Sequence, residues 1–246
     1  MAKAAPEEQL RLLELQAYDS KLNTLRRQAD TVRSSPEIAA LQTRVGSADG
    51  ELVLANTAVR DLERELTRAE DDVQSVVVRL ERDEKRLNSG QGTSKELTAL
   101  QSEVASLSRR RSDLEDIELD VMERMEAARS ALETVQQRTE ALRTELSALE
   151  AARDAALDEL ERQRALVQQE RLEFSQGIEP SLLALYEKTL AKRGVGAARL
   201  FHGRSEGSGM ELSPGDLAEI AKAEPDAVFM CPDSGCILVR SADWGH

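Results

Sequence analysis

The sequence is poor in aromatic residues, and this shortage argues against an ordinary compact globule. Phe, Tyr and Trp make up 2% of the 246 residues, whereas charged residues make up 32%. A globular domain of this length normally fills its core with aromatic side chains, which each bury a large area. A chain dominated by Ala, Leu, Glu and Arg is instead typical of long helices or of disorder, and hydrophobic periodicity decides between the two.

Cysteines are few, and long apolar runs and excess positive charge are missing. No run of 18 apolar residues occurs, and the first residues lack the apolar stretch of a signal peptide, so we expect a cytoplasmic protein that does not enter membranes. Two cysteines, Cys231 and Cys236, are too few for a disulfide framework. The net charge of −13 disfavours general nucleic-acid binding, which depends on Lys and Arg neutralising phosphates.

Motifs of catalysis and nucleotide binding are absent as well. There is no Walker loop and no Gly-x-Gly-x-x-Gly, and the glycine-rich stretch 203–209 lacks the Lys-Ser/Thr pair of a phosphate-binding loop. The two histidines, His202 and His246, have no evident partner for acid–base chemistry. Carboxylates on the helices are expected to form solvated pairs at i,i+4 spacing. We therefore predict a protein that is not an enzyme and binds no cofactor.

The clearest positive signal is a heptad repeat that follows Pro36. Steps of three and four residues from Ile38 to Leu87 meet apolar side chains at fourteen of fifteen positions, and the exception is Asp83. This 3.5-residue spacing forms the narrow a/d seam of a left-handed coiled coil, whereas a globular helix shows a wider stripe.

A second seam of the same spacing runs from Leu97 to Leu149. Thirteen of its sixteen positions are apolar, and the pattern continues more loosely to Val167. Arg111 and Glu118 interrupt this seam, and we expect them to fix its register, as polar core positions can. A shorter apolar run fills the N-terminal region at Leu15, Tyr18, Leu22, Leu25, Ala29 and Val32.

Two breaks divide these seams into three helices, expected at about 7–33, 36–87 and 94–175. Residues 88–94 form a turn by composition, with the tip near Gly90. Thr93 or Ser94 is positioned to cap the third helix, with Glu96 completing a capping box. Ser35 is the expected N-cap before a proline in the first turn of the second helix.

The lengths of these helices favour an antiparallel hairpin within one chain. The third helix is about as long as the first two together, and a short glycine-containing turn joins it to the second. A parallel dimer between two chains is the alternative. We predict a mainly α fold, with a coiled-coil helical hairpin over residues 1–176 and a break at Pro36.

Composition changes after residue 176, and residues 177–246 are expected to form a small α/β cap. A short helix is predicted over Ser181–Arg193, and a second one begins at Ser213–Asp216. Most of the glycines follow Gly194, between segments that are typical of short strands. These segments are 195–202, 227–231 and 237–240.

The order of motifs resembles a known family. The long hairpin is followed by Leu185-Tyr-Glu, a glycine-rich strand, Met210-Glu-Leu-Ser-Pro and Cys231-Pro-Asp-Ser-Gly-Cys-Ile-Leu-Val-Arg. This order resembles the bacterial coiled-coil proteins that end in a four-cysteine zinc ribbon. Lys95-Glu-Leu-Thr-Ala-Leu-Gln, after the tip, is also similar to that family.

The resemblance implies two Cys-x-x-Cys knuckles, and this sequence has lost most of them. Matching the neighbouring residues places the knuckles at 205–208 and 231–234. Their four ligand positions are Ser205, Ser208, Cys231 and Ser234, of which Cys231 alone keeps a thiol. Structural zinc needs four thiolate or imidazole ligands, and serine hydroxyls are poor substitutes. We expect a degenerate ribbon without zinc.

Other uses of the two cysteines remain open. Cys236 lies two residues beyond the second knuckle, and a site made of Cys231, Cys236, His202 and His246 matches no known ligand spacing. A Cys231–Cys236 disulfide is geometrically feasible but is disfavoured in a reducing cytoplasm.

Basic residues gather near the expected tip and form the candidate partner-binding site. One interpretation is a basic end on an acidic rod; the other, which we favour, is ion pairing between helices with Glu81, Asp83, Glu84 and Glu96. The basic residues concerned are Arg79, Arg82, Lys85, Arg86, Lys95, Arg109, Arg110 and Arg111.

The sequence therefore predicts a non-enzymatic adaptor, scaffold or chaperone-like protein that binds protein partners through its rod and cap. The resemblance supports this, since such proteins look like chaperones or scaffolds. The alternative is a nucleic-acid-associated protein that uses the basic tip or the cap. Against it, residues 178–246 carry seven basic and ten acidic side chains. The identity of the partner and the state of self-association stay open.

Overall fold

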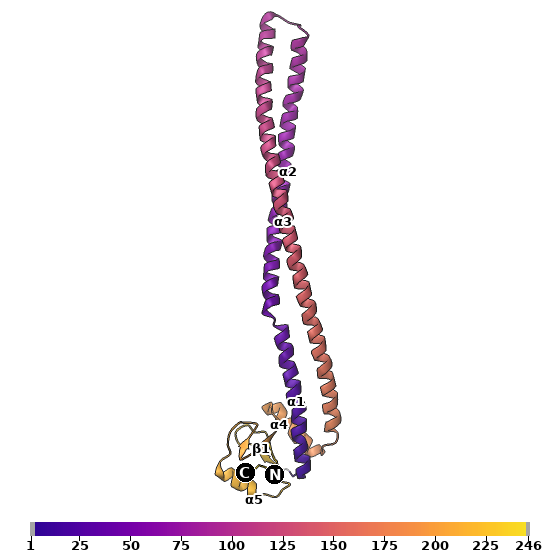
Figure 1. Cartoon of the computed structure of the whole chain (residues 1–246), viewed down its shortest axis with the longest axis vertical. Helices are drawn as coiled ribbons and strands as arrows, with labels where there is room; N and C mark the ends of the chain where they lie inside the picture. Colours follow the sequence, from indigo (N-terminus) through magenta and orange to yellow (C-terminus); the bar gives the residue numbers. More distant parts are fainter. Residues whose placement is uncertain (1–2, 245–246) are drawn as a thin grey trace. The chain divides into compact units, whose positions relative to one another are not determined.

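The computed structural model describes residues 3–244. This part of the chain contains five helices and four short strands. The elements are α1 (Pro6–Arg33), α2 (Pro36–Asn88), α3 (Ser94–Ser175), α4 (Pro180–Arg193), β1 (Ala197–Phe201), β2 (Arg204–Ser205), α5 (Pro214–Lys222), β3 (Phe229–Met230) and β4 (Ile237–Arg240). The three long helices agree with the expected ranges to within a residue or so, and the predicted mainly α fold is confirmed (Figure 1).

The contacts between residues group the chain into two units. One contains residues 36–151, and the other combines residues 1–35 with residues 152–246. The expected division into 1–176 and 177–246 stays a prediction, although the contacts join α1 to the C-terminal residues.

The first unit is an antiparallel hairpin of α2 and the first part of α3. Ion pairs between the two helices show the direction, because residue numbers on α3 rise as those on α2 fall. These pairs are Arg79–Glu103, Arg124–Glu65, Arg129–Glu63, Arg138–Glu51 and Arg143–Asp49. The intramolecular hairpin is thus the arrangement of this unit.

The heptad seams form the interface between these helices. Every expected seam position of α2 is buried or half-buried, including Asp83, whose carboxylate lies beside Arg79 and Arg82. On α3 the same is true from Leu97 to Leu149, with the exception of Arg111. The expectation for Arg111 was wrong, because its side chain is exposed and pairs with Glu115 one turn along the same helix.

The tip turns where the sequence predicts it. Gly90 and Gly92 have φ angles of 65° and 136°, which side chains other than glycine rarely adopt. Thr93 and Glu96 form the capping box: the Thr93 N–H donates to Glu96 Oε2 at 2.6 Å, and the Glu96 N–H donates to Thr93 Oγ1 at 3.4 Å. These bonds supply partners for groups that the helix itself leaves unpaired.

The second unit centres on a four-stranded sheet with the order β2-β1-β4-β3. β1 pairs in parallel with β4, and the outer strands pair antiparallel with their neighbours. Alternate residues of the central strands enter two separate cores. Ala197, Ile237 and Val239 face α1 and α4, whereas Ala198 and Leu238 face α5 and the turn after β3. β2 was not predicted, because a two-residue strand carries no periodicity.

Helix α1 completes the first of these cores, which the heptad pattern did not indicate. Leu12 and Leu15 are fully buried beside Leu182 and Tyr186 of α4. Just before α1, the Ala4 N–H donates to the Asp226 carbonyl at 2.8 Å. The N-terminal helix is therefore part of the cap.

A buried polar network joins α1, α3 and α4. Arg171 donates two hydrogen bonds to the Asp19 carboxylate, at 2.7 and 3.0 Å, and the Tyr186 hydroxyl donates to the same group at 2.6 Å. Gln16 accepts from the Gly196 N–H at 2.7 Å, which ties the network to the start of β1. Burial, together with the Asp19 carboxylate, raises the pKa of the Tyr186 phenol.

Candidate functional site

The two degenerate knuckle segments lie side by side in the cap. Ser205 ends β2 and Ser208 lies in the turn that follows, while Cys231 and Ser234 lie in the turn between β3 and β4. The Cys231 Sγ is 3.8 Å from Ser208 Oγ, so the structure brings the predicted positions together. Cys236, predicted only as a weak member, belongs to the same cluster.

The turn between β3 and β4 keeps the form of a knuckle around Cys231. The Ser234 N–H donates to Cys231 Sγ at 3.5 Å, and Gly235, with a φ of 71°, donates its N–H to the Cys231 carbonyl at 2.9 Å. The Ser234 hydroxyl lies 3.1 Å from Cys236 Sγ. One serine thus contacts both sulfur atoms.

The two thiols have different pKa values because their neighbours differ. Burial raises the pKa of Cys231, but hydroxyl groups of Ser205 and Ser234 and N–H groups of the turn favour its thiolate more strongly and bring the pKa to about 7. Burial raises the pKa of Cys236 above its ordinary value. Ser205 Oγ is fully buried and, within the described residues, makes no hydrogen bond of ordinary geometry, although it lies near Cys231.

This set of donors does not fit a structural zinc ion. Zinc ribbons use four thiolate or imidazole ligands, and here neutral hydroxyls stand at three of the four knuckle positions. Residues 3–244 contain no group of three or more His, Cys, Asp or Glu side chains placed to hold a metal. His202 lies apart from the thiols, with its ring 4.1 Å from that of Phe201, and His246 lies outside the described residues.

The basic residues near the tip are only partly paired. Arg79 bonds Glu103 of the other helix at 2.5 Å, Arg82 contacts Asp83, and Arg111 contacts Glu115. Arg109 donates to the Ala105 carbonyl of its own helix. The remaining members are Lys85, Arg86, Lys95 and Arg110.

These remaining residues differ in how far acidic neighbours neutralise their positive charge. Lys85, Lys95 and Arg110 make no ion pair or side-chain hydrogen bond within residues 3–244. The hydrogen bonds from Thr93 are the main cause of the lowered pKa of Glu96, and the positive charge of Arg86 lowers it further. Arg79 does pair between the helices, but with Glu103, which that interpretation did not name, and the ion pairs of Asp83 lie within α2. Within residues 3–244, Glu81 and Glu84 form no ion pair with these basic residues.

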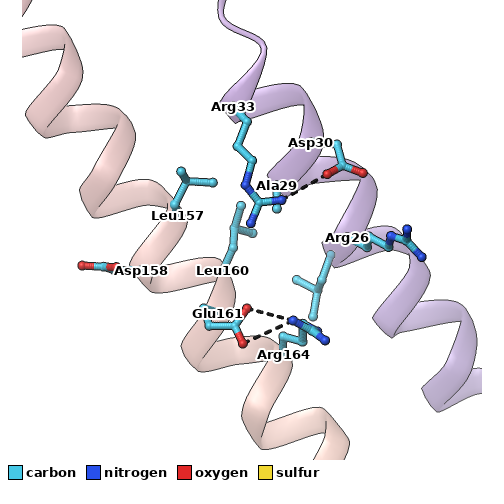
Figure 2. Close-up of a pocket in the computed structure, with 10 residues that line it drawn as sticks. Arg26, Ala29, Asp30, Arg33, Leu157, Asp158, Leu160, Glu161 and Arg164 are labelled. Atoms are coloured by element: carbon cyan, nitrogen blue, oxygen red, sulfur yellow. Dashed lines mark hydrogen bonds and ion pairs between the residues drawn. The ribbon is translucent and has the colours of Figure 1, made fainter.

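A groove between α1 and α3 was not predicted (Figure 2). It encloses about 570 Å³ near the C-terminal end of α1, and its residues all belong to the unit that contains the cap. Its lining consists of Leu25, Arg26, Ala29, Asp30, Arg33, Leu157, Asp158, Leu160, Glu161 and Arg164. The signal in the sequence was the looser heptad pattern after Leu149, which indicates that two helices no longer fill one seam.

The groove has an apolar floor and a charged rim. Figure 2 shows Leu157 and Leu160 of α3 directed toward α1, with Ala29 facing them. Arg33 pairs with Asp30 at 3.1 Å on one side, and Arg164 pairs with Glu161 at 3.1 Å on the other. Such a floor, flanked by charges of both signs, is typical of coiled-coil surfaces that accept a further helix.

No helix within residues 3–244 is both long enough and apolar enough to span a membrane.

The comparisons with known proteins point to one family. The model of the CT398-like coiled coil hairpin domain matches residues 15–194. An uncharacterised protein of Mycobacterium tuberculosis strain H37Rv is 33% identical over 238 residues, which cover 97% of each chain.

Solved structures agree with the fold. A protein of Mycobacterium smegmatis has a TM-score of 0.86 and 31% identity, and the match covers 97% of this chain and all of that one. CT398 of Chlamydia trachomatis has a TM-score of 0.67 at 17% identity, with 96% and 98% of the two chains covered, which shows a shared fold alone. The matched residues include the whole hairpin and α4. This chain therefore belongs to the CT398-like coiled coil hairpin family.

Proposed function

We propose that this protein is a non-enzymatic scaffold that binds a helical segment of a protein partner in the groove between α1 and α3. The groove itself is the observation that carries the proposal. Leu157 and Leu160 are only half-buried, although they face the neighbouring helix. A groove with a volume of about 570 Å³ lies between them and α1. Amphipathic helices commonly bind by laying an apolar face into such a groove.

The chemistry of the rim restricts the partner. Arg33 and Arg164 lie on opposite sides of the groove, each beside an acidic residue one turn away. A partner helix with Leu or Ile at a/d positions and charges of both signs at the flanking positions fits this rim. A uniformly basic or acidic segment fits less well, because it would face a like charge on both sides of the groove.

The test compares neighbouring residues on the same turn of α3. Leu157→Glu places a charge on the floor of the groove, whereas Ala156→Glu places the same charge on the exposed face. In-cell crosslinking followed by mass spectrometry identifies the partner in the unmodified protein. Binding of that partner is then measured with the purified variants. We expect Leu157→Glu to lower affinity at least tenfold, which is about 1.4 kcal/mol, and Ala156→Glu to leave it unchanged.

Folding has to be separated from binding in this test. Both variants are compared by circular dichroism, and Ala29→Glu on the facing helix provides a second charge in the groove. Equal affinity of all three variants for the partner would show that the groove is not its binding site. Loss of helicity in Leu157→Glu alone moves the comparison to Ala29→Glu.

A second candidate function rests on the tip. Among residues 3–244, Lys85, Lys95 and Arg110 are cationic side chains without ion pairs, and cationic clusters bind nucleic acids through phosphate contacts. If the tip binds RNA or DNA, affinity falls steeply with salt, and replacing these three residues with Ala reduces the salt slope. The net charge of −13 favours the first proposal. Tight nucleic-acid binding at physiological salt would reverse that preference.

A further inference from the structure

The two cysteines occupy facing positions at the end of a strand ladder. β3 and β4 pair antiparallel, with Phe229 opposite Leu238 and Met230 opposite Ile237. The next pair along the ladder is Cys231 and Cys236, and the Cys231 N–H donates to the Cys236 carbonyl at 2.8 Å. Directly opposed residues of such a ladder have Cβ atoms about 4.5–5.5 Å apart, against about 3.5–4.5 Å in a disulfide, so bonding needs the two residues to approach by about 1 Å.

Their side chains also lie on the same side of the turn. Both sulfur atoms contact Ser234: its N–H donates to Cys231 Sγ at 3.5 Å, and its hydroxyl lies 3.1 Å from Cys236 Sγ. Both cysteines belong to one apolar cluster, and their side chains are 1% and 0% exposed. Two thiols that face each other in one buried cluster need only a small movement to bond.

We propose that Cys231 and Cys236 form a reversible intramolecular disulfide when the protein meets a small peroxide. One cysteine sulfur, as its thiolate, attacks a peroxide oxygen, the O–O bond breaks, and a sulfenic acid forms as hydroxide leaves. The second sulfur then attacks the sulfenic sulfur and displaces its oxygen as water. Two thiols and one hydrogen peroxide thus give one disulfide and two waters, and two electrons pass from sulfur to oxygen.

The position of the pair limits which oxidants can reach it. A methyl group on Gly207 would lie 2.7 Å from Cys236 Sγ and 2.8 Å from the Ala198 side chain, so the turn after β2 covers the thiols closely. Hydrogen peroxide is small enough to enter when this turn opens locally. Bulky reagents need a larger opening, and we expect them to react far more slowly with the folded protein.

The experiment counts thiols in the full chain before and after peroxide. The reduced protein, unfolded in denaturant, takes up two maleimide groups, one for each cysteine. After peroxide we expect it to take up none, to lose the mass of two hydrogen atoms and to remain a single chain without reductant. Dithiothreitol is expected to restore both thiols.

The variants separate a disulfide from ordinary oxidation. In Cys236→Ser the sulfenic acid has no second thiol to resolve it, so we expect it to persist on Cys231 and to be trapped by dimedone. Cys231→Ala with the same treatment tests whether Cys236 can be the cysteine that peroxide oxidises first. Circular dichroism checks that each variant is folded. Sulfinic acid on the unmodified protein, a disulfide between two chains, or two thiols that survive peroxide would each overturn the proposal.

Discussion

At the scale of single residues, Tyr186 links α1, α3 and α4. Its ring is fully buried against α1, and its hydroxyl donates to Asp19, which is also bound by Arg171. A methyl group on Gly196 would lie 2.4 Å from this ring, so the strand that follows α4 passes it closely. Tyr186 therefore contacts α1 and the start of β1 from within α4.

The raised pKa of Tyr186 predicts that the cap loses stability at alkaline pH. A tyrosine in the unfolded chain ionises near pH 10, whereas in the folded protein burial and Asp19 hold the proton more tightly. The network's contribution is complete below that pH and falls as the pH rises above it. Urea unfolding at pH 8 and pH 11 should show this loss, and Tyr186→Phe should reduce it. An equal loss in both proteins would contradict this assignment.

Gly207 gives a second prediction at this scale. Gly207→Ala places a methyl group within 3 Å of Cys236 Sγ and of the Ala198 side chain, so the turn has to move outward. We expect a less stable cap, by about 1–3 kcal/mol as in other overpacked cores, and faster reaction of both thiols with a bulky disulfide reagent. Gly215→Ala, whose added methyl group meets the Ser213 hydroxyl at an ordinary 3.6 Å, is the control.

At the scale of elements, the start of α3 carries a local cap at exposed positions. Glu96 is exposed and accepts hydrogen bonds from the Thr93 N–H and hydroxyl, which lower its pKa. Glu96→Ala should leave the hairpin folded but speed hydrogen exchange several-fold in the first turn of α3. Lys95→Ala, on the same turn without these bonds, should have no such effect.

The stability that the cap of α3 contributes falls at low pH, whereas the contribution of Tyr186 falls at high pH. Because the folded protein lowers the pKa of Glu96, the cap contributes fully above the ordinary carboxyl pKa and is lost as pH falls below it. Hydrogen exchange at pH 7 and at pH 3, corrected for intrinsic rates, should therefore show fraying of the first turn at low pH. In Glu96→Ala the corrected rates should not differ between the two pH values.

Elements with regular periodicity were the ones that sequence could predict. Repeated a/d positions located α2 and α3, and the Thr93–Glu96 spacing located the capping box. The contact of Leu12 with β4 joins residues more than 200 positions apart, and no local pattern encodes such a distance. The groove was missed because the looser heptad pattern after Leu149 does not give the distance between α1 and α3.

The candidate site was predictable in position but not in chemistry. Matching the neighbouring residues assigned Ser205, Ser208, Cys231 and Ser234 to two knuckle segments. These segments meet, with Ser208 Oγ 3.8 Å from Cys231 Sγ, although the strands before them, β2 and β3, lie at opposite edges of the sheet. The opposition of Cys231 and Cys236 depends on the ladder between β3 and β4. That ladder has two residues in β3, too few for a strand period to show its register.

At the scale of the whole molecule, the cap is expected to need both ends of the chain. Leu12 and Leu15 are fully buried against residues of α4, β1 and β4. Residues 177–246 expressed alone should therefore expose the face that α1 covers, bind a hydrophobic dye and unfold without a cooperative transition. A covalent fusion of residues 3–35 to residues 152–246 through a flexible linker should restore the transition. A cooperative fold of 177–246 alone would support the domain division predicted from composition.

The substitution Leu15→Ala tests within the whole chain whether the cap depends on α1. Leu15→Ala removes a fully buried side chain shared by α1 and the cap, and such changes cost about 2–5 kcal/mol. We expect the cap signals to unfold earlier in denaturant. Leu54→Ala, which shortens a side chain that is 71% exposed on α2, should have little effect.

The pairing of β1 with β4 around a core that includes α1 also bears on the order in which the protein is made. Leu15 is synthesised more than 200 residues before Val239, its partner in this core. At about 5–20 residues per second, the apolar face of α1 waits roughly 10–45 s for that partner. Chains released before β4 would keep this face uncovered, and cellular proteases could recognise them by it.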